Sequence, residues 1–186
     1  MASIVGSLHQ DHINSTKLLD VLEQQLVIFS RAEVPDYEMM QGITDYFLDY
    51  PNLYHHPTED LILRKMKTRS WTAKDGFPDL HDEHQNLEVM TRGFSTAIQN
   101  ILLEIEITRE AFQQRARKFL DFYRSHIRKE EEVFFPAALE VLTKEDWVEI
   151  SEVRDVWDDP IFRPKSRGRL ETLREGILAW SGATGI

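Results

Sequence analysis

The stretch HHPTEDL at residues 55–61 decides how the rest of the chain is interpreted, because its spacing returns in HIRKEEEVFFP at residues 126–136. In both stretches a histidine is followed four residues later by a glutamate: His55 by Glu59, and His126 by Glu130. Residues four apart on an α-helix lie one above the other on the same face. Each pair is therefore predicted to aim an imidazole and a carboxylate at the same point.

Around these pairs, apolar residues recur at steps of three and four, which indicates long amphipathic helices. The predicted helices cover residues 3–31, 36–66, 78–105 and 108–137, with the third beginning at Pro78 or Asp79. Strand-like alternation is absent from the sequence. Four helices with short connections predict an all-α fold, an antiparallel up-down four-helix bundle.

Each predicted apolar stripe is interrupted by polar residues. These are His12 in the first helix, His55 and Glu59 in the second, His84 in the third, and His126 and Glu130 in the fourth. The fourth stripe is predicted to continue through Val133 and Ala137. Proline lacks a backbone N–H, so Pro57 predicts a kink or a helix restart, and Pro136 predicts a bend.

The bundle is assigned to residues 1–142, and residues 143–186 are assigned to a C-terminal extension of short helices that packs on the bundle. Thr143 is predicted to be the N-cap of the first of these helices. Residues 158–169 are predicted to form a loop and residues 170–180 a final helix.

Composition excludes several classes of function. The chain has no cysteine, which removes disulfides, thiolate catalysis and sulfur-bound metals, and fits a cytoplasmic protein. Lys and Arg number 22 against 32 Asp and Glu, a net charge of −10, which argues against nucleic acid and against an anionic membrane surface. No apolar run approaches the roughly 18 residues of a membrane span, and the N-terminal residues do not resemble a secretory signal.

Imidazoles and carboxylates in a bundle core would cost several kcal/mol per unpaired ion, and bound metal offsets that cost. Imidazole nitrogen suits iron, zinc and copper, and bridging carboxylates suit a pair of ions. The sequence therefore predicts a site for two metal ions. The candidate ligands are His12, His55, Glu59, His84, His126 and Glu130.

At these residues the chain resembles the hemerythrin-like family, the HHE cation-binding domains. The resemblance spans residues 4–140, through QDH at 10–12, HHPTED at 55–60, DEH at 82–84 and HIRKEEEVFFP at 126–136. It implies a non-heme centre of two iron ions inside a four-helix bundle. It further implies that the four histidines are terminal nitrogen ligands and that Glu59 and Glu130 bridge the irons.

Two departures separate this chain from the oxygen-carrying hemerythrins. Those proteins have a second histidine four residues before the one in the third helix, where this chain has Leu80. Their fourth helix carries His-x-x-x-x-Asp, where this chain has His126 and Glu130. A site poorer in histidine places the chain closer to the branch of iron-centre repair proteins and iron or oxygen sensors.

The roles of two further histidines stay open. His56 follows a candidate ligand directly and so points about 100° away on a regular helix, although a kink at Pro57 could turn it inward. His81 is predicted to lie at the surface or beside the ligands, with substitution for the missing third-helix ligand as the alternative. His9 is predicted to be a solvated surface residue.

Several other residues near the motifs have ordinary explanations. Glu131 and Glu132 are predicted to belong to a solvated face. Asp82 and Glu83 are predicted to complement the helix dipole, with orientation of a ligand imidazole as the alternative. Tyr54 and Tyr123 are predicted mainly to pack, although a phenol near iron could tune it.

The leading functional hypothesis is a di-iron protein that binds dioxygen or nitric oxide, with a role in sensing, storage or iron handling. Divalent metals other than iron are compatible with the same ligands. A second hypothesis is a di-iron enzyme that reduces peroxide or nitric oxide or repairs iron centres. A third is a metal-free interaction module in which the histidines form a buried polar network.

Overall fold

The computed structural model describes residues 2–69, 71 and 80–153, and every regular element in these ranges is helical, as predicted. The elements are α1 (Ala2–Ser30), α2 (Tyr37–Tyr50), the π-helical turn η1 (Pro51–His55), α3 (His56–Thr68), α4 (Leu80–Leu102), α5 (Arg109–Lys129), the π-helical turn η2 (Glu130–Phe134), α6 (Phe135–Val141) and α7 (Lys144–Val153).

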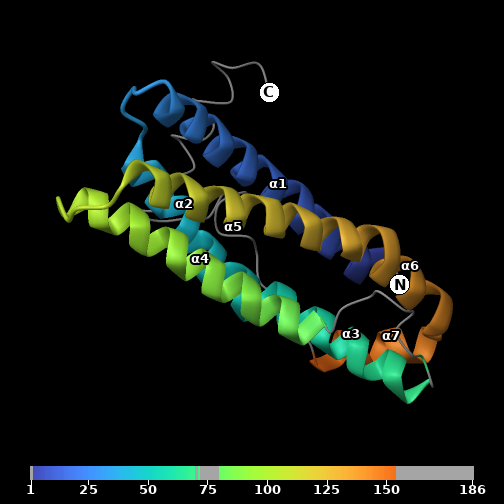
Figure 1. Ribbon diagram of the computed structural model, residues 1–186. Helices are drawn as coiled ribbons and strands as arrows, with labels where there is room; N and C mark the ends of the chain where they lie inside the picture. The colour runs from blue at the N-terminus through green and yellow to red at the C-terminus, as the bar shows by residue number, and fades with distance from the viewer. Residues whose placement is uncertain (1, 70, 72–79, 154–186) are drawn as a thin grey trace.

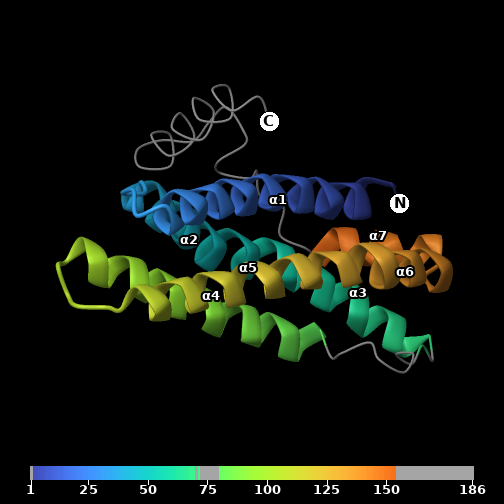
Figure 2. The same cartoon turned by 45° about the horizontal axis from the view of Figure 1, so that its top comes forward.

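Four long helical segments lie side by side (Figures 1 and 2): α1, then α2 continued by η1 and α3, then α4, then α5 continued by η2 and α6. Helix α1 contacts α2 and α5, and α4 contacts the same two helices on the other side. The four segments therefore enclose a common interior. None of the helices in the described ranges has the length and apolarity needed to cross a bilayer.

Helices α2 and α5 begin where the sequence predicted, directly after Asp36 and Thr108. Asp36 caps α2 by accepting a hydrogen bond from the backbone N–H of Met39 at 2.8 Å, and Thr108 caps α5 by accepting one from Ala111 at 3.2 Å. Helix α4 ends at Leu102, so the prediction that it continues to Ile105 is wrong. The left-handed backbone at Glu104 (φ 56°) ends the helical path, and Ile105 is 52 % exposed.

The interior consists of two apolar clusters separated by a polar layer. One cluster includes Leu18, Tyr50, Leu87 and Tyr123, and the other includes Leu8, Ile62, Leu80 and Phe134. In each of the four segments the predicted histidines lie between a residue of the first cluster and a residue of the second. The polar layer is therefore closed on both sides by apolar packing.

The two π-helical turns change the register of the helices that carry the His-x-x-x-Glu motifs. A π turn holds more residues than an α turn, so the inward face moves along the sequence. From the end of η2 the buried residues are Phe134, Phe135 and Ala138, and the prediction of Val133 and Ala137 is wrong: Val133 is 38 % exposed and Ala137 only partly buried.

The prolines accompany these turns rather than causing a break at their own positions. The N–H of His56 bonds to the carbonyl of Pro51, which closes the wide turn before Pro57 is reached. Pro57 and Pro136 stand in the first turns of α3 and α6, where a missing N–H costs no intrahelical bond.

Helix α7 is fixed against α3 by a buried carboxylate. Thr143 and Asp146 cap the helix reciprocally: the Thr143 N–H donates to Asp146 at 2.9 Å, and the Asp146 N–H donates to Thr143 at 3.4 Å. Asp146 also accepts two hydrogen bonds of 2.9 Å from Arg69. The loop and final helix predicted for residues 158–180 lie outside the described residues.

Candidate metal centre

The polar layer is made of imidazoles and carboxylates that are almost wholly withdrawn from solvent. It contains His12, His55, His56, Glu59, His84, His126 and Glu130. Both glutamates have 0 % exposure, and the most exposed member, His84, has 7 %. An ionised carboxylate in such a place requires compensating positive charge.

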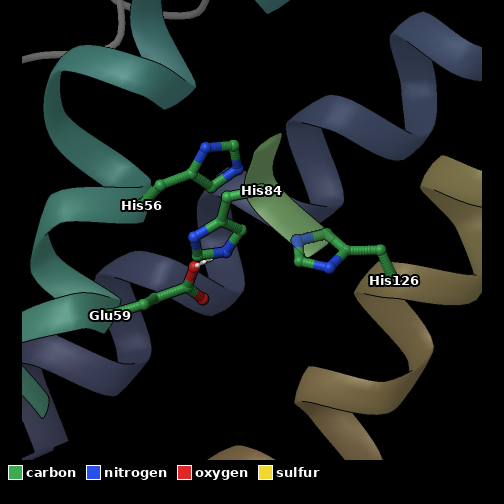
Figure 3. Close-up of side chains that lie close together, drawn as sticks. All are labelled: His56, Glu59, His84 and His126. Atoms are coloured by element: carbon green, nitrogen blue, oxygen red, sulfur yellow. Dashed lines mark ion pairs between the residues drawn. The ribbon is translucent and has the colours of Figure 1, made fainter. Parts of the chain in front are cut away.

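These side chains form two groups that share a member. His56, Glu59, His84 and His126 form the first group, and His12, His55, Glu59 and Glu130 form the second. Within each group one nitrogen or oxygen atom per residue lies within 4.8 Å of all the others. Figure 3 shows the first group, with His84 and Glu59 joined by a contact of 3.3 Å.

Glu130 also reaches both groups. Its Oε1 lies 3.0 Å from Nε2 of His126 in the first group, and its Oε2 lies 3.2 Å from Nε2 of His12 in the second. Glu59 makes the corresponding pair of contacts, 3.3 Å to His55 and 3.3 Å to His84. The two carboxylates therefore stand between two sets of imidazoles.

The structure brings together all six candidate ligands named from the sequence. The two histidines whose roles were left open, His56 and His81, lie in different places. His56 lies inside the cluster, with its ring stacked on that of His84 at 4.0 Å between centroids. His81 lies outside it, exposed and within hydrogen-bonding distance of Gln85 at 2.9 Å. The identity of the metal ligands remains a prediction, now with seven candidates.

The π turn η1 explains how neighbouring residues both face inward. His55 continues the inward face of α2, four residues after Pro51. His56 begins the inward face of α3, which continues through Glu59 and Leu63. On an unbroken α-helix two adjacent side chains would point about 100° apart.

Four of the imidazoles are held from behind through their Nδ1 atoms. His12 contacts Glu131 at 2.7 Å, His55 contacts Asp11 at 3.2 Å, His56 contacts Asn52 at 3.1 Å, and His126 contacts Glu83 at 3.1 Å. A partner at Nδ1 fixes the ring orientation and leaves Nε2 facing the centre.

Some of these outer partners contradict the sequence predictions. Glu131 is not simply part of a solvated face, because η2 turns it toward His12 and also toward His9, 3.0 Å away. Glu132 is exposed as predicted. Glu83 orients His126, which is the alternative that the sequence favoured less. No role was predicted for Asp11 or Asn52, because their contacts depend on the placement of η1.

The cluster favours positive charge strongly. Burial lowers the pKa of His126, but the charges and hydrogen bonds of the surrounding carboxylates, chiefly Glu130, together raise that pKa to about 9. Burial likewise lowers the pKa of His12, yet its contacts with Glu130 and Glu131 raise it above the ordinary value. Burial raises the pKa of Glu130, but the charge of His126 and the contacts of three imidazoles together hold that pKa well below its usual range. Protons or metal ions can supply this positive charge.

The alignment of the inner atoms fits metal ions better than protons. Both carboxylate oxygens of Glu59, Oε2 of Glu130 and Nε2 of His126 are buried without a hydrogen-bond partner, although imidazole nitrogens and carboxylate oxygens lie within 3.5 Å of one another. These atoms approach one another without the alignment of hydrogen bonds. Nitrogen and oxygen donors that converge in this way suit transition-metal ions.

The contact between His12 and His55 also fits a bound metal ion better than a proton. Their Nε2 atoms lie 3.0 Å apart, while each Nδ1 faces a carboxylate. If both rings are neutral and donate through Nδ1, two nitrogen lone pairs face each other. A cation between them removes that repulsion and uses both lone pairs.

A small cavity adjoins the imidazoles. It is lined by Asp11, His12, Ser15, Tyr46, Tyr50, Pro51, His55, His56, Tyr123 and His126. The centre of a water-sized sphere can occupy about 10 Å³ of it, enough for roughly one water. Burial raises the pKa of Tyr123 well above its ordinary value, with smaller contributions from Glu130 and Glu59, so its phenol keeps its proton.

Comparison with known proteins agrees with this geometry. No curated protein and no solved structure matches the chain. The family model described as the hemerythrin HHE cation-binding domain matches residues 3–138, which contain all seven side chains of the cluster. The chain therefore belongs to the hemerythrin family of HHE cation-binding domains.

Proposed function

We propose that this chain is a non-heme di-iron protein that binds dioxygen or nitric oxide, in a sensing, storage or iron-handling role. The helical segments would form an antiparallel up-down four-helix bundle around the two ions. The observation that carries the proposal is the convergence of seven buried side chains, among which both carboxylate oxygens of Glu59, one of Glu130 and Nε2 of His126 lack hydrogen-bond partners. Family membership supports iron as the metal.

The two ions would have unequal surroundings. His56, His84 and His126 would hold one ion, and His12 and His55 the other, with Glu59 and Glu130 shared between them. The second ion would therefore have one imidazole fewer. An added ligand would find fewer protein donors to compete with at that ion.

The iron pair, when bound, would supply reversible binding of a small ligand and the electrons exchanged with it. The chain would supply a dry setting, since apolar clusters cover the polar layer on both sides. The adjoining cavity, with room for about one water, favours a diatomic ligand over a larger enzyme substrate.

Metal analysis tests the proposal directly. Protein loaded anaerobically with ferrous iron should hold about two irons per chain, one for each group of donors. Its optical spectrum should change on exposure to air or to nitric oxide. Near-zero iron, zinc and manganese would contradict the proposal and favour a metal-free interaction module.

A double substitution tests the ligand assignment. His12→Ala with His126→Ala removes one imidazole from each group and should abolish iron binding. His81→Ala is the matched control, because His81 is exposed and lies outside both groups. Iron retained by the double variant at the level of the control would refute the assignment.

A further inference from the structure

One imidazole of the cluster lacks the outer support that the other four have. The Nδ1 atoms of the other four lie between 2.7 and 3.2 Å from a carboxylate or amide oxygen. Nδ1 of His84, by contrast, is buried without a hydrogen-bond partner. The ring stacks on that of His56, but stacking fixes neither ring nitrogen in place. His84 is therefore the candidate ligand with the weakest outer support.

The carboxylate that faces this Nδ1 atom belongs to Asp60. Oδ1 of Asp60 lies 3.8 Å from Nδ1 of His84, which is too far for a hydrogen bond. Bonds from a metal ion such as zinc to imidazole nitrogen or carboxylate oxygen are each about 2.0–2.2 Å long, so one ion can bind two donors at this separation. The pair of atoms therefore fits a shared cation better than a shared proton.

The ring of His84 separates two consecutive carboxylates of α3. On its outer side is Asp60, whose side chain is 37 % exposed and so meets solvent. On its inner side, Nε2 lies 3.3 Å from Glu59, which is fully buried. A cation held by Asp60 would thus have a single imidazole between itself and a carboxylate of the buried centre.

Arg64 is the positively charged side chain that contacts Asp60, and it does so through the backbone. Its Nε donates to the Asp60 carbonyl at 3.3 Å, and its side chain lines a groove between α3 and α7. The Asp60 carboxylate instead faces His84 on α4. Because the guanidinium and the carboxylate are not paired, the negative charge of Asp60 can attract a cation.

We propose that Asp60 and Nδ1 of His84 form an outer receiving site for divalent metal ions, through which metal enters the buried centre. The ion would bind Asp60 at the surface, then Nδ1 of His84, and would pass to Glu59 when the imidazole rotates away. This rests on the proposed function, because it requires a metal centre to be filled. Asp60 belongs to neither inner group of donors, so it would govern the rate of loading rather than the strength of binding.

The test measures the rates of metal loading and release in the full-length protein. Cobalt(II) is mixed with metal-free protein and followed by its visible absorption in a stopped-flow instrument. Release is followed after adding EDTA, at concentrations where the rate no longer depends on EDTA. The variant is Asp60→Asn. Asp82→Asn is the matched control, because it removes the same charge from an exposed side chain two residues before His84 and outside the cluster.

Asp60→Asn should slow loading about 10-fold, the low end of the 10- to 1000-fold by which charge raises association rates. Release should slow by about the same factor, because the ion leaves by the path through which it enters. Affinity should therefore change less than about 3-fold, and the final absorption should be unchanged. Asp82→Asn should load within about 2-fold of the unchanged protein.

Three results would overturn the inference alone: equal loading rates in Asp60→Asn and the unchanged protein, equal slowing by Asp82→Asn, and faster release with lower affinity in Asp60→Asn. The second would indicate a general effect of charge, and the third would indicate that Asp60 only orients His84. Absence of cobalt and iron uptake by the unchanged protein would instead contradict the proposed function, and the inference with it.

Discussion

The ring of His56 stacks on the ring of His84, with centroids 4.0 Å apart and an interplanar angle of 13°. The oxygen-carrying relatives have a second histidine in the third helix, where this chain has Leu80, which lies in an apolar cluster. His56 comes from the second helical segment and brings the cluster to five imidazoles. The cluster therefore holds one imidazole more than the four named as ligands from the sequence, and the added one is His56, whose role the sequence left open.

His56→Ala should weaken iron binding in the first group while leaving the fold intact. Loss of an outer partner of a metal ligand typically costs 10- to 100-fold in affinity, and loss of a ligand should cost at least as much. Iron content and dissociation constants measure the effect. His81→Ala is the control, and identical iron binding by the two variants would remove His56 from the ligand set.

The part of the site that follows from local spacing could be predicted from the sequence. His55 with Glu59, and His126 with Glu130, share a helix face whatever surrounds them. The polar break at His12 could be located because the stripe of α1 is regular, and its members from Ile4 to Phe29 are buried or nearly so. These features depend on one helix at a time.

The rest of the site depends on the two π-helical turns. The sequence contains a sign of η1 that the prediction did not use. Phe47, Pro51, His55 and Glu59 are all buried and follow one another in steps of four. Each such step overshoots an α-helical turn of 3.6 residues by about 40°. Three in a row need a wider turn, which η1 provides. The inward positions of His56 and Glu131 follow from such turns, whereas contacts such as Asp11 with His55 also require the placement of a second helix.

Glu131→Gln should weaken metal binding about 10- to 100-fold, because it removes the charge that orients His12 through Nδ1 at 2.7 Å. Glu132→Gln is a close control: it makes the same chemical change at the next position, on an exposed side chain. Competition with a chromophoric chelator measures both affinities. Equal affinities for the two variants would show that the Glu131 contact does not support the centre.

Metal affinity should rise with pH from 7 to 9. In metal-free protein the pKa of His126 is raised to about 9, chiefly by the charge of Glu130 acting against burial. Protons therefore compete with metal at neutral pH, and deprotonation frees the imidazole to bind. Cobalt(II), followed by its visible absorption, avoids the precipitation of iron at high pH. A flat profile over this interval would contradict the expected competition.

The same proton linkage predicts proton release on metal binding. A weakly buffered sample at pH 7 should acidify when cobalt(II) is added, because histidines with raised pKa values lose protons to the solution. The His12→Ala and His126→Ala double variant is the control and should release few protons. Equal release by the double variant would place the protons elsewhere in the protein.

Asp146→Asn should destabilise the attachment of α7 by about 1–3 kcal/mol. The side chain of Asp146 is 1 % exposed, and the substitution weakens its bonds to Arg69 and to the Thr143 N–H. Urea unfolding of the metal-free protein measures the change. Glu149→Gln is the control, because Glu149 is 64 % exposed and should contribute no more than about 0.5 kcal/mol.

The Asp146 contribution should also depend on pH in a definite direction. The hydrogen bond from Arg69 holds the pKa of Asp146 well below its usual range, so the folded protein binds this proton less readily than the unfolded chain does. The stabilisation is therefore complete above the unfolded pKa of about 3.9 and declines as pH falls below it. The difference in unfolding free energy between the unchanged protein and Asp146→Asn should stay constant from pH 7 to 5 and shrink below pH 4. A difference that grows on acidification would show that the carboxylate is not stabilised by its charge.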